Sequence, residues 1–302
     1  MVSAETKDGS MTTRLTGVSE TLLIPLWARA VEGDSPEPIV TDHKAAEMVA
    51  QIDYDFSKFH SARLSQVGVA VRTMLFDRAV RAVVERHPRA VVVNLGAGLD
   101  TRHERLKLQH IDWYELDVPE SMAWRRHFFV ESQRYHFLTK SVFDLSWMDD
   151  IEDAGRPVLL IAEGLFMYFA EEKLRPLFQG IAARFAGQGM LFEMLAPFLV
   201  GRSKHHDSVS KVDGSAEFRW ALKDSRTLQT WHEGIRVAQE WNYLDYCKTR
   251  WGWFGRFARL PFIRPRFASR IVQLRFASKS TQGTPRIATT AKPGQRVGVV
   301  DR

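Results

Sequence analysis

Two glycines and an acid follow a run of β-branched residues in the segment VVVNLGAGLDTR, residues 91–102. Glycine permits positive φ angles and lets a ligand approach the backbone without a Cβ in the way. A glycine turn directly after a buried strand is where α/β proteins with doubly wound sheets bind their ligands. Gly96 and Gly98 are therefore the first candidates for a binding site, with a purely structural turn as the alternative.

The glycine pattern departs from the fingerprint of dinucleotide-binding proteins. Thr101 occupies the place of the third glycine, and Asp100 begins the helix that the pattern predicts for residues 100–108. A carboxylate suits the amino end of a helix but would repel a pyrophosphate. We therefore expect a ligand without phosphate, and an NAD(P)-dependent oxidoreductase stays only as an alternative.

Two further acids follow predicted strands. Asp117, in WYELDVPE, comes about 20 residues after the glycines, where an acid accepts hydrogen bonds from ribose hydroxyls. Its alternative role is a helix cap before Pro119. Glu163 follows the apolar run PVLLIA, and a carboxylate at the mouth of a crevice requires a partner. A cationic or amine-bearing ligand would be such a partner, with Tyr168 nearby either in a pocket wall or in the core.

The elements that must position these residues alternate between strands and helices. Helical periodicity over residues 19–32, 44–51 and 61–87 predicts an N-terminal helical cap. The predicted strands span residues 90–94, 111–116, 135–139, 157–162, 190–193, 236–243 and 271–276. Strands separated by helices of this length predict an α/β fold, with a Rossmann-like, doubly wound and mostly parallel seven-stranded sheet.

We expect one domain flanked by two tails. Residues 1–18 are predicted to be a flexible N-terminus, and residues 19–278 form the domain, with the cap at 19–88 and the sheet core at 89–278. Residues 279–302, rich in Ser, Thr, Gly and Pro, are predicted to be a disordered basic tail.

Charge and composition limit the classes of partner. The formal net charge of +6 is regional, because residues 248–302 carry 13 Lys and Arg against one acid, leaving −6 elsewhere. This basic end raises nucleic-acid binding as an alternative function, although a solvated tail is the more ordinary explanation. No apolar run is long enough to span a bilayer, so no membrane partner is expected. The single cysteine, Cys247, allows neither an internal disulfide nor a cysteine metal cluster, which fits the cytoplasm.

The three motifs together resemble one enzyme family. NLGAGLDTR, YELDVPE and LLIAEGLFMYF, in this order and spacing, resemble the leucine carboxyl methyltransferase family of class I S-adenosylmethionine enzymes. Within it, they are most similar to the bacterial branch that includes tetracenomycin-type polyketide O-methyltransferases. The segments SETLLIPLWARAVE and IDYDFSKF also resemble that branch. The resemblance covers roughly residues 19–192, whereas the C-terminal third matches poorly.

This resemblance implies S-adenosylmethionine as the cofactor and assigns residues to it. Arg72 would pair with the methionine carboxylate, although an exposed helix charge is its alternative role, and Glu163 would face the methionine amino group. The remaining implied contacts are Gly96 and Gly98 beneath the methionine, Asp117 at the ribose, and Ser141, Val142 and Asp144 at the adenine. Ser141 replaces an acid of some relatives, and Asn94 stands where many class I methyltransferases carry an acid.

The methyl acceptor decides what other chemistry is needed. Methyl transfer from a sulfonium is an in-line displacement, for which a carboxylate acceptor needs no strong base whereas a phenol or enol does. Candidates for such a base are Tyr168, His205 and His206, although adjacent histidines in a polar stretch are typical of a solvated loop. The aromatic residues of 241–257 suggest either a lid over a polycyclic substrate or a buried sheet edge.

We therefore predict an O-methyltransferase that acts on a carboxylate or hydroxyl of a small molecule, of the kind found in polyketide metabolism. A protein C-terminal carboxyl methyltransferase is the alternative within the family. No metal site is predicted, and the oligomeric state is left open.

Overall fold

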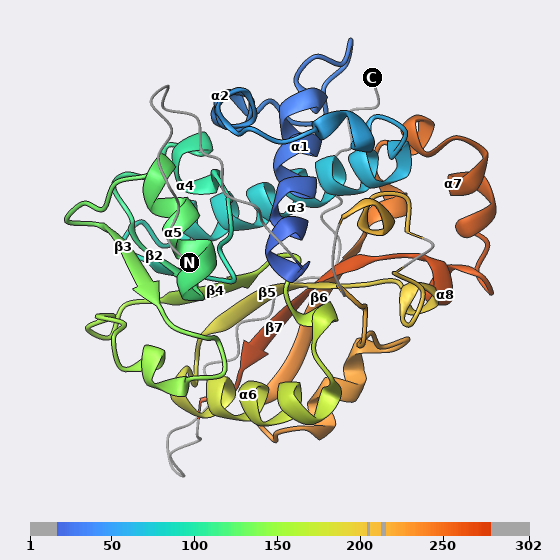
Figure 1. Cartoon of the computed structure of the whole chain (residues 1–302). Helices are drawn as coiled ribbons and strands as arrows, with labels where there is room; N and C mark the ends of the chain where they lie inside the picture. Colours follow the sequence, from blue (N-terminus) through green and yellow to red (C-terminus); the bar gives the residue numbers. More distant parts are fainter. Residues whose placement is uncertain (1–16, 204–205, 213–215, 279–302) are drawn as a thin grey trace.

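A seven-stranded sheet forms the centre of the computed structural model, which describes residues 17–203, 206–212 and 216–278 (Figure 1). The strand order is β3-β2-β1-β4-β5-β7-β6. All pairs from β3 to β5 are parallel, and β7 runs antiparallel to both β5 and β6. The strands are β1 (Val91–Leu95), β2 (Asp112–Asp117), β3 (Tyr135–Thr139), β4 (Val158–Ala162), β5 (Gly189–Met194), β6 (Ile235–Asn242) and β7 (Arg270–Phe276). The predicted mostly parallel sheet is confirmed.

Helices cover both faces of the sheet (Figure 1). The α-helices are α1 (Leu23–Glu32), α2 (His43–Gln51), α3 (Arg63–Arg86), α4 (Arg102–Arg105), α5 (Pro119–Phe128), α6 (Glu171–Arg184), α7 (Gly252–Ala258) and α8 (Arg264–Phe267). Short 3-10 helices are η1 (Gly17–Leu22), η2 (Phe56–Phe59), η3 (Leu145–Met148), η4 (Phe166–Tyr168), η5 (Pro197–Leu199), η7 (Val209–Lys211), η8 (Ser225–Thr230), η9 (Tyr243–Asp245) and η10 (Lys248–Trp251). The helices α1, α2 and α3 form the predicted N-terminal cap.

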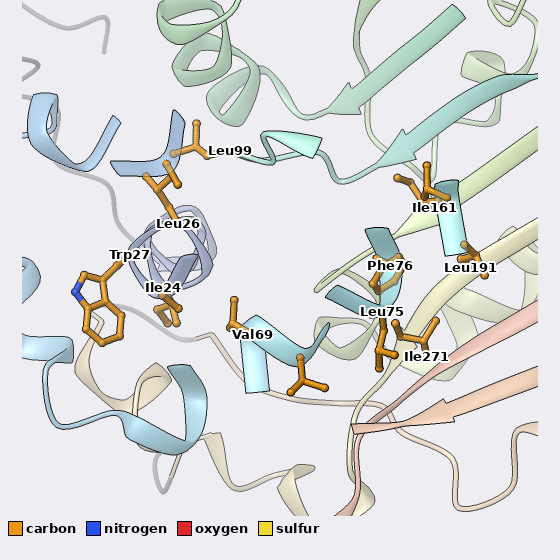
Figure 2. Packing of buried hydrophobic residues seen from close by; sticks show 14 of the residues in the cluster. Ile24, Leu26, Trp27, Val69, Leu75, Phe76, Leu99, Ile161, Leu191 and Ile271 are labelled. Carbon is orange, nitrogen blue, oxygen red and sulfur yellow. The ribbon is translucent and has the colours of Figure 1, made fainter. Parts of the chain in front are cut away.

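The alternation of side chains along each strand builds two apolar cores. Val92 and Leu191 belong to the core under α1 and α3, whereas Val91 and Leu160 belong to the core under α6. Figure 2 shows part of the first core, with Leu75 and Phe76 of α3 beside Ile271 of β7. Because both faces of the sheet are covered, the central strands β1 and β4 are buried along their whole length, and their aliphatic runs made them recognisable in the sequence.

One predicted element is much shorter than expected. The helix predicted for residues 100–108 is only the four-residue α4. Lys107 has a φ of 57°, which interrupts helical geometry. The side chains of Arg102 and Arg105 both bind Asp77 of α3, so this turn serves to place two arginines beside the sheet.

The predicted tails lie almost wholly outside the described residues. Residues 1–16 and 279–302 lie outside the described residues, and residues 17–18 begin η1. Among the described helices, none combines the length and the apolar character that crossing a bilayer requires.

Candidate active site

A cavity of about 390 Å³ lies at the carboxyl ends of β1, β4 and β5. The glycine loop after β1 and the polar side chains at the strand ends form one part of its lining. Apolar side chains from the helical cap and the C-terminal third form the other part: Ile24, Leu64, Val69, Met167, Leu195, Phe198, Leu199, Val209, Phe218, Leu244, Trp251, Phe254 and Phe267. The carboxyl edge of a parallel sheet is the expected place for a ligand in this architecture.

Both glycines of the loop are required by the fold itself. Gly96 has a φ of 68° and Gly98 a φ of 48°, backbone angles that residues with a side chain rarely adopt. A Cβ at Gly96 would lie 2.6 Å from Leu165 Cδ1, and one at Gly98 would lie 2.8 Å from Leu22 Cδ2. The loop is thus a tight structural turn that also lines the cavity, so the two alternatives from the sequence are compatible. Its contact with a cofactor stays a prediction.

Asp117 holds this loop in place. Its Oδ2 accepts a hydrogen bond of 2.7 Å from the backbone N–H of Gly98, and its Oδ1 accepts one of 2.8 Å from that of Val118. Burial raises the pKa of Asp117, an effect that these backbone hydrogen bonds partly offset. The residue precedes the N-cap of α5, which is Val118. Asp117 therefore lies beside the glycine loop but is not among the residues that line the cavity, and its contact with a ribose stays a prediction.

Arg72 is not an exposed helix charge. Its side chain is only 12% exposed and lines the cavity. Its Nε donates to Glu163 Oε1 at 2.7 Å, and its Nη1 donates to Glu193 Oε2 at 2.8 Å. Glu193 in turn accepts a 3.0 Å hydrogen bond from the hydroxyl of Tyr243. The structure thus brings Arg72 and Glu163 together on the cavity wall, whereas their contacts with a cofactor stay predictions.

Glu163 has partners within the chain. It is bound by Arg102 as well as by Arg72. These two arginines supply the positive charge that the sequence analysis expected from a cationic ligand. Burial alone would raise the pKa of Glu163, but these two guanidinium groups outweigh it and lower the pKa. Glu163 is therefore an ionised carboxylate on the cavity wall.

The ion pair continues into a large buried network. Arg102 also binds Asp77 and Asp100, and Asn94 bridges Asp100 to Glu115. The connected carboxylates are Asp42, Asp77, Asp100, Glu115, Glu163 and Glu193, and the arginines are Arg29, Arg72, Arg102, Arg105 and Arg125. Acids thus exceed arginines by one in this network, so its wall of the cavity favours a ligand with positive charge.

Asp100 plays a different role from the one expected. Burial would raise its pKa, but Arg102 and Arg105 lower it strongly, so it is ionised within the network. Two other carboxylates of the network, those of Glu115 and Glu193, have a raised pKa and so bind a proton more readily. Burial raises the pKa of Glu115 to about 7, and burial raises that of Glu193 against the opposing charge of Arg72.

Sequence reasoning missed most of the residues of this network. Among them, Arg29, Arg102 and Glu193 take part in the network or line the cavity. Glu193 stands in the apolar strand MLFEM, and the burial argument that identified Glu163 would have identified it too. Arg102 is the arginine of the LDTR motif, whereas Arg29 carries no comparable signal. Tyr243 was expected only as one of the aromatic residues of 241–257.

The residues implied at the adenine lie away from the cavity lining. Asp144 is exposed and accepts a 3.2 Å hydrogen bond from the N–H of Ser146, capping η3. The carbonyl of Val142 accepts a bond from Trp147 Nε1 at 3.1 Å. Ser141 Oγ accepts a 3.3 Å bond from the N–H of Phe143. None of the three is among the residues around the cavity, and their adenine contacts stay predictions.

The histidine pair is only partly described, because His205 lies outside the described residues. His206 is 21% exposed, lines the cavity and packs edge-on against Phe218. The solvated-loop interpretation is therefore wrong for His206. Burial lowers its pKa while Asp207, 3.7 Å from Nδ1, opposes this, so the ring is neutral at pH 7.

Tyr168 also lines the cavity. Burial raises the pKa of its hydroxyl, so Tyr168 stays protonated and can donate a hydrogen bond but is unsuited to act as a base. In the aromatic segment, both interpretations hold for different residues. Tyr243, Trp251 and Phe254 line the cavity, whereas Trp253 is 79% exposed.

Comparison with known families then decides the class. The model of the family described as leucine carboxyl methyltransferase matches residues 23–182, a range that contains the glycine loop, Asp117 and Glu163. The chain belongs to this family. It is an S-adenosylmethionine-dependent methyltransferase, as the relatives below also indicate.

Two relatives extend the match over most of this methyltransferase. It is 31% identical over 235 residues to the tetracenomycin polyketide synthesis O-methyltransferase TcmP of Streptomyces glaucescens, covering 78% of this chain and 86% of TcmP. It is 29% identical over 280 residues to the S-adenosyl-L-methionine-dependent methyltransferase dpfgK of Gibberella zeae, covering 85% and 93%. A DUF574 family protein from Streptomyces avermitilis has the same fold, with a TM-score of 0.53, 11% identity and 85% and 97% coverage.

Replacing Asp117 by asparagine tests the ribose assignment. We expect the Kd for S-adenosylmethionine to rise about tenfold, because one charged acceptor of hydrogen bonds is lost. The amide oxygen can still accept one of the two backbone hydrogen bonds, from the N–H of Gly98 or of Val118, so the variant should stay folded with a modest fall in melting temperature. Calorimetric titration measures the affinity, with Asp149→Asn as an exposed control. An unchanged Kd would remove Asp117 from the cofactor site.

Proposed function

We propose that this methyltransferase methylates a carboxylate oxygen of a small, largely apolar acceptor. The observation that carries the proposal is the composition of the cavity. Its acid-rich polar lining, with ionised Glu163 beside Arg72, adjoins a lining of aromatic and aliphatic side chains. The first part suits a cofactor with an amino group and a sulfonium, and the second suits a hydrophobic acceptor.

The chain's own residues would bind and orient the cofactor. Arg72 can bind the methionine carboxylate, and Glu163 the ammonium group. Asp117 and the loop with Gly96 and Gly98 would hold the ribose and the methionine, with residues 141–144 at the adenine. S-adenosylmethionine, when bound, supplies a methyl group on a positively charged sulfur. The protein then needs chiefly to align an acceptor oxygen behind that methyl group and to exclude water.

A carboxylate acceptor fits the titratable groups that face the cavity. It is already ionised at pH 7 and therefore needs no base. The protonated hydroxyl of Tyr168 can donate a hydrogen bond to the second carboxylate oxygen. The matched family is named for carboxyl methylation, and TcmP is named for polyketide synthesis. We therefore expect an aromatic acid of polyketide type as the acceptor, and a cytoplasmic enzyme.

A hydroxyl acceptor is the second candidate, and one observation favours it. Neutral His206 lies in the cavity wall, where a neutral imidazole can remove a proton from a phenol. The carboxyl and hydroxyl alternatives thus differ in whether His206 takes part.

The deciding experiment determines the chemical class of the product. The purified enzyme is first titrated calorimetrically with S-adenosylmethionine, S-adenosylhomocysteine and NAD, and only the two sulfur ligands are expected to bind. It is then incubated with methyl-labelled cofactor and polycyclic aromatic acids or phenols. Mild alkali releases labelled methanol from an ester but not from an ether. Alkali-stable label would favour the hydroxyl alternative, and binding of NAD alone would overturn the proposal.

The variant His206→Asn separates the two acceptors kinetically. With a carboxylic acid, we expect kcat/KM within about threefold of the wild type, because no proton is removed. With a phenol, the loss should be about 100-fold or more. Because burial lowers the pKa of His206, phenol methylation in the wild type should decline only as the pH falls below the usual titration range of histidine. Equal losses with both acceptors would assign His206 to acceptor binding.

A further inference from the structure

Four exposed apolar side chains lie on α7 and in the segment that joins α7 to α8. Trp253 is 79% exposed, Phe257 46%, Leu260 40% and Phe262 80%. We call these four residues the aromatic face. Figure 1 shows α7 at the periphery of the molecule, away from the central strands. Isolated apolar residues are common on protein surfaces, but four large ones within ten residues indicate a site of interaction.

The aromatic face is surrounded by positive charge. Residues 248–268 contain six Lys and Arg and no acid. Arg256 and Arg266 are exposed, and neither forms an ion pair within the described ranges. Two other arginines of this segment are paired, Arg250 with Glu32 and Arg264 with Asp245. The partner of this face is therefore expected to be negatively charged.

The same segment forms part of the cavity wall. Trp251, Phe254 and Phe267 line the cavity, while Trp253 and Phe257 point outward. Gly255 and Ala258 are buried, so α7 has one face toward the core and one toward the outside. A partner bound to the aromatic face would thus lie next to the apolar part of the cavity.

Charge and shape decide between the possible partners. A second copy of the chain would bring two arginine-rich faces together, which like-charge repulsion opposes. The rings of Trp253 and Phe262 are 79% and 80% exposed. They therefore protrude from the surface and do not form the walls of a groove that would hold a folded protein. Exposed tryptophan and phenylalanine next to arginine are typical of proteins that lie on lipid surfaces.

We propose that the aromatic face binds the surface of an anionic lipid bilayer. Trp253 and Phe262 insert at the level of the headgroups, and Arg256 and Arg266 bind the lipid phosphates. The inference goes beyond the proposed function. It concerns binding to the surface of a bilayer, whereas the lack of a long apolar run speaks only against segments that span one. Its use would be to give a hydrophobic acceptor direct access to the cavity.

Sedimentation with lipid vesicles tests this proposal on the full-length chain. We expect binding to phosphatidylglycerol vesicles, weakening as salt is raised, and little binding to phosphatidylcholine vesicles. The double variant Trp253→Ser/Phe262→Ser should lose at least tenfold in partitioning. Arg256→Ser/Arg266→Ser should reduce binding to the anionic vesicles alone. The matched control is Val130→Ser, at a residue that is 86% exposed elsewhere on the surface.

Three results would overturn the proposal. These are no binding of the wild type to anionic vesicles, equal binding by the double variant, and a wild-type dimer that the double variant converts to a monomer. The last result, measured by light scattering, would assign the face to a second copy. Titration with S-adenosylmethionine accompanies every variant and should give the wild-type Kd, so failure of membrane binding is distinguishable from failure of the proposed function.

Discussion

Replacing Glu163 by glutamine is expected to weaken the binding of S-adenosylmethionine by about 30- to 100-fold. The carboxylate lies on the cavity wall, ionised between Arg72 and Arg102. Glutamine has nearly the same shape but cannot balance an ammonium group, and hydrogen bonds between charged groups contribute about 1.5–3 kcal/mol. The variant also removes one ionised carboxylate from the cavity wall, which makes this wall less favourable for a cationic ligand.

Calorimetric titration measures this effect. S-adenosylhomocysteine, which keeps the amino group, should lose affinity to a similar degree. The control Glu171→Gln changes a glutamate of α6 that pairs with Arg175 and whose side chain is 37% exposed, and it should bind both ligands normally. If Glu163→Gln kept the wild-type Kd while remaining folded, the assignment of Glu163 to the amino group would have to be abandoned.

The largest loss of stability is expected for Arg102→Met. The guanidinium group is 1% exposed and binds Asp77, Asp100 and Glu163. Methionine fills a similar volume but leaves three buried carboxylates without this shared counter-charge. Breaking a buried ion pair in this way costs about 3–5 kcal/mol, a large fraction of the stability of a typical domain.

Urea unfolding of the variant measures this change in the free energy of unfolding. The matched control is Arg126→Met, which breaks the pair with Glu131 at an exposed position. Such exposed pairs contribute about 1 kcal/mol at most. Equal losses in the two variants would mean that the buried network contributes no more to stability than a surface ion pair.

The sheet was predictable because its pattern is local. A strand covered on both faces is mostly apolar, and β1 and β4 are five-residue runs buried throughout. Glycines and prolines mark where such runs end. The short α4 was mispredicted because its length depends on the backbone at Lys107 and on ion pairs to α3, which sequence periodicity does not reveal.

The candidate site was predictable at positions where the residue type would lower stability unless the local backbone or a charged partner required it. Gly96, Gly98 and Glu163 follow buried strands, and the positive φ angles and buried charge found there explain why those types are needed. Arg29 was missed because nothing in its own segment marks it. Arg29 reaches the backbone carbonyl of Leu99, 70 positions away in the chain.

The sequence by itself determined which segments form strands, which family the chain belongs to and which acids follow the strands, because burial and backbone geometry impose residue types locally. Only the tertiary structure decided which charges meet. It joined Arg72 of α3 to Glu163 after β4 and Glu193 in β5, and it placed His206 in the cavity wall instead of in solvent. The reason is physical: an ion pair depends on distance in space, and long-range packing brings together side chains whose separation along the chain carries no signal.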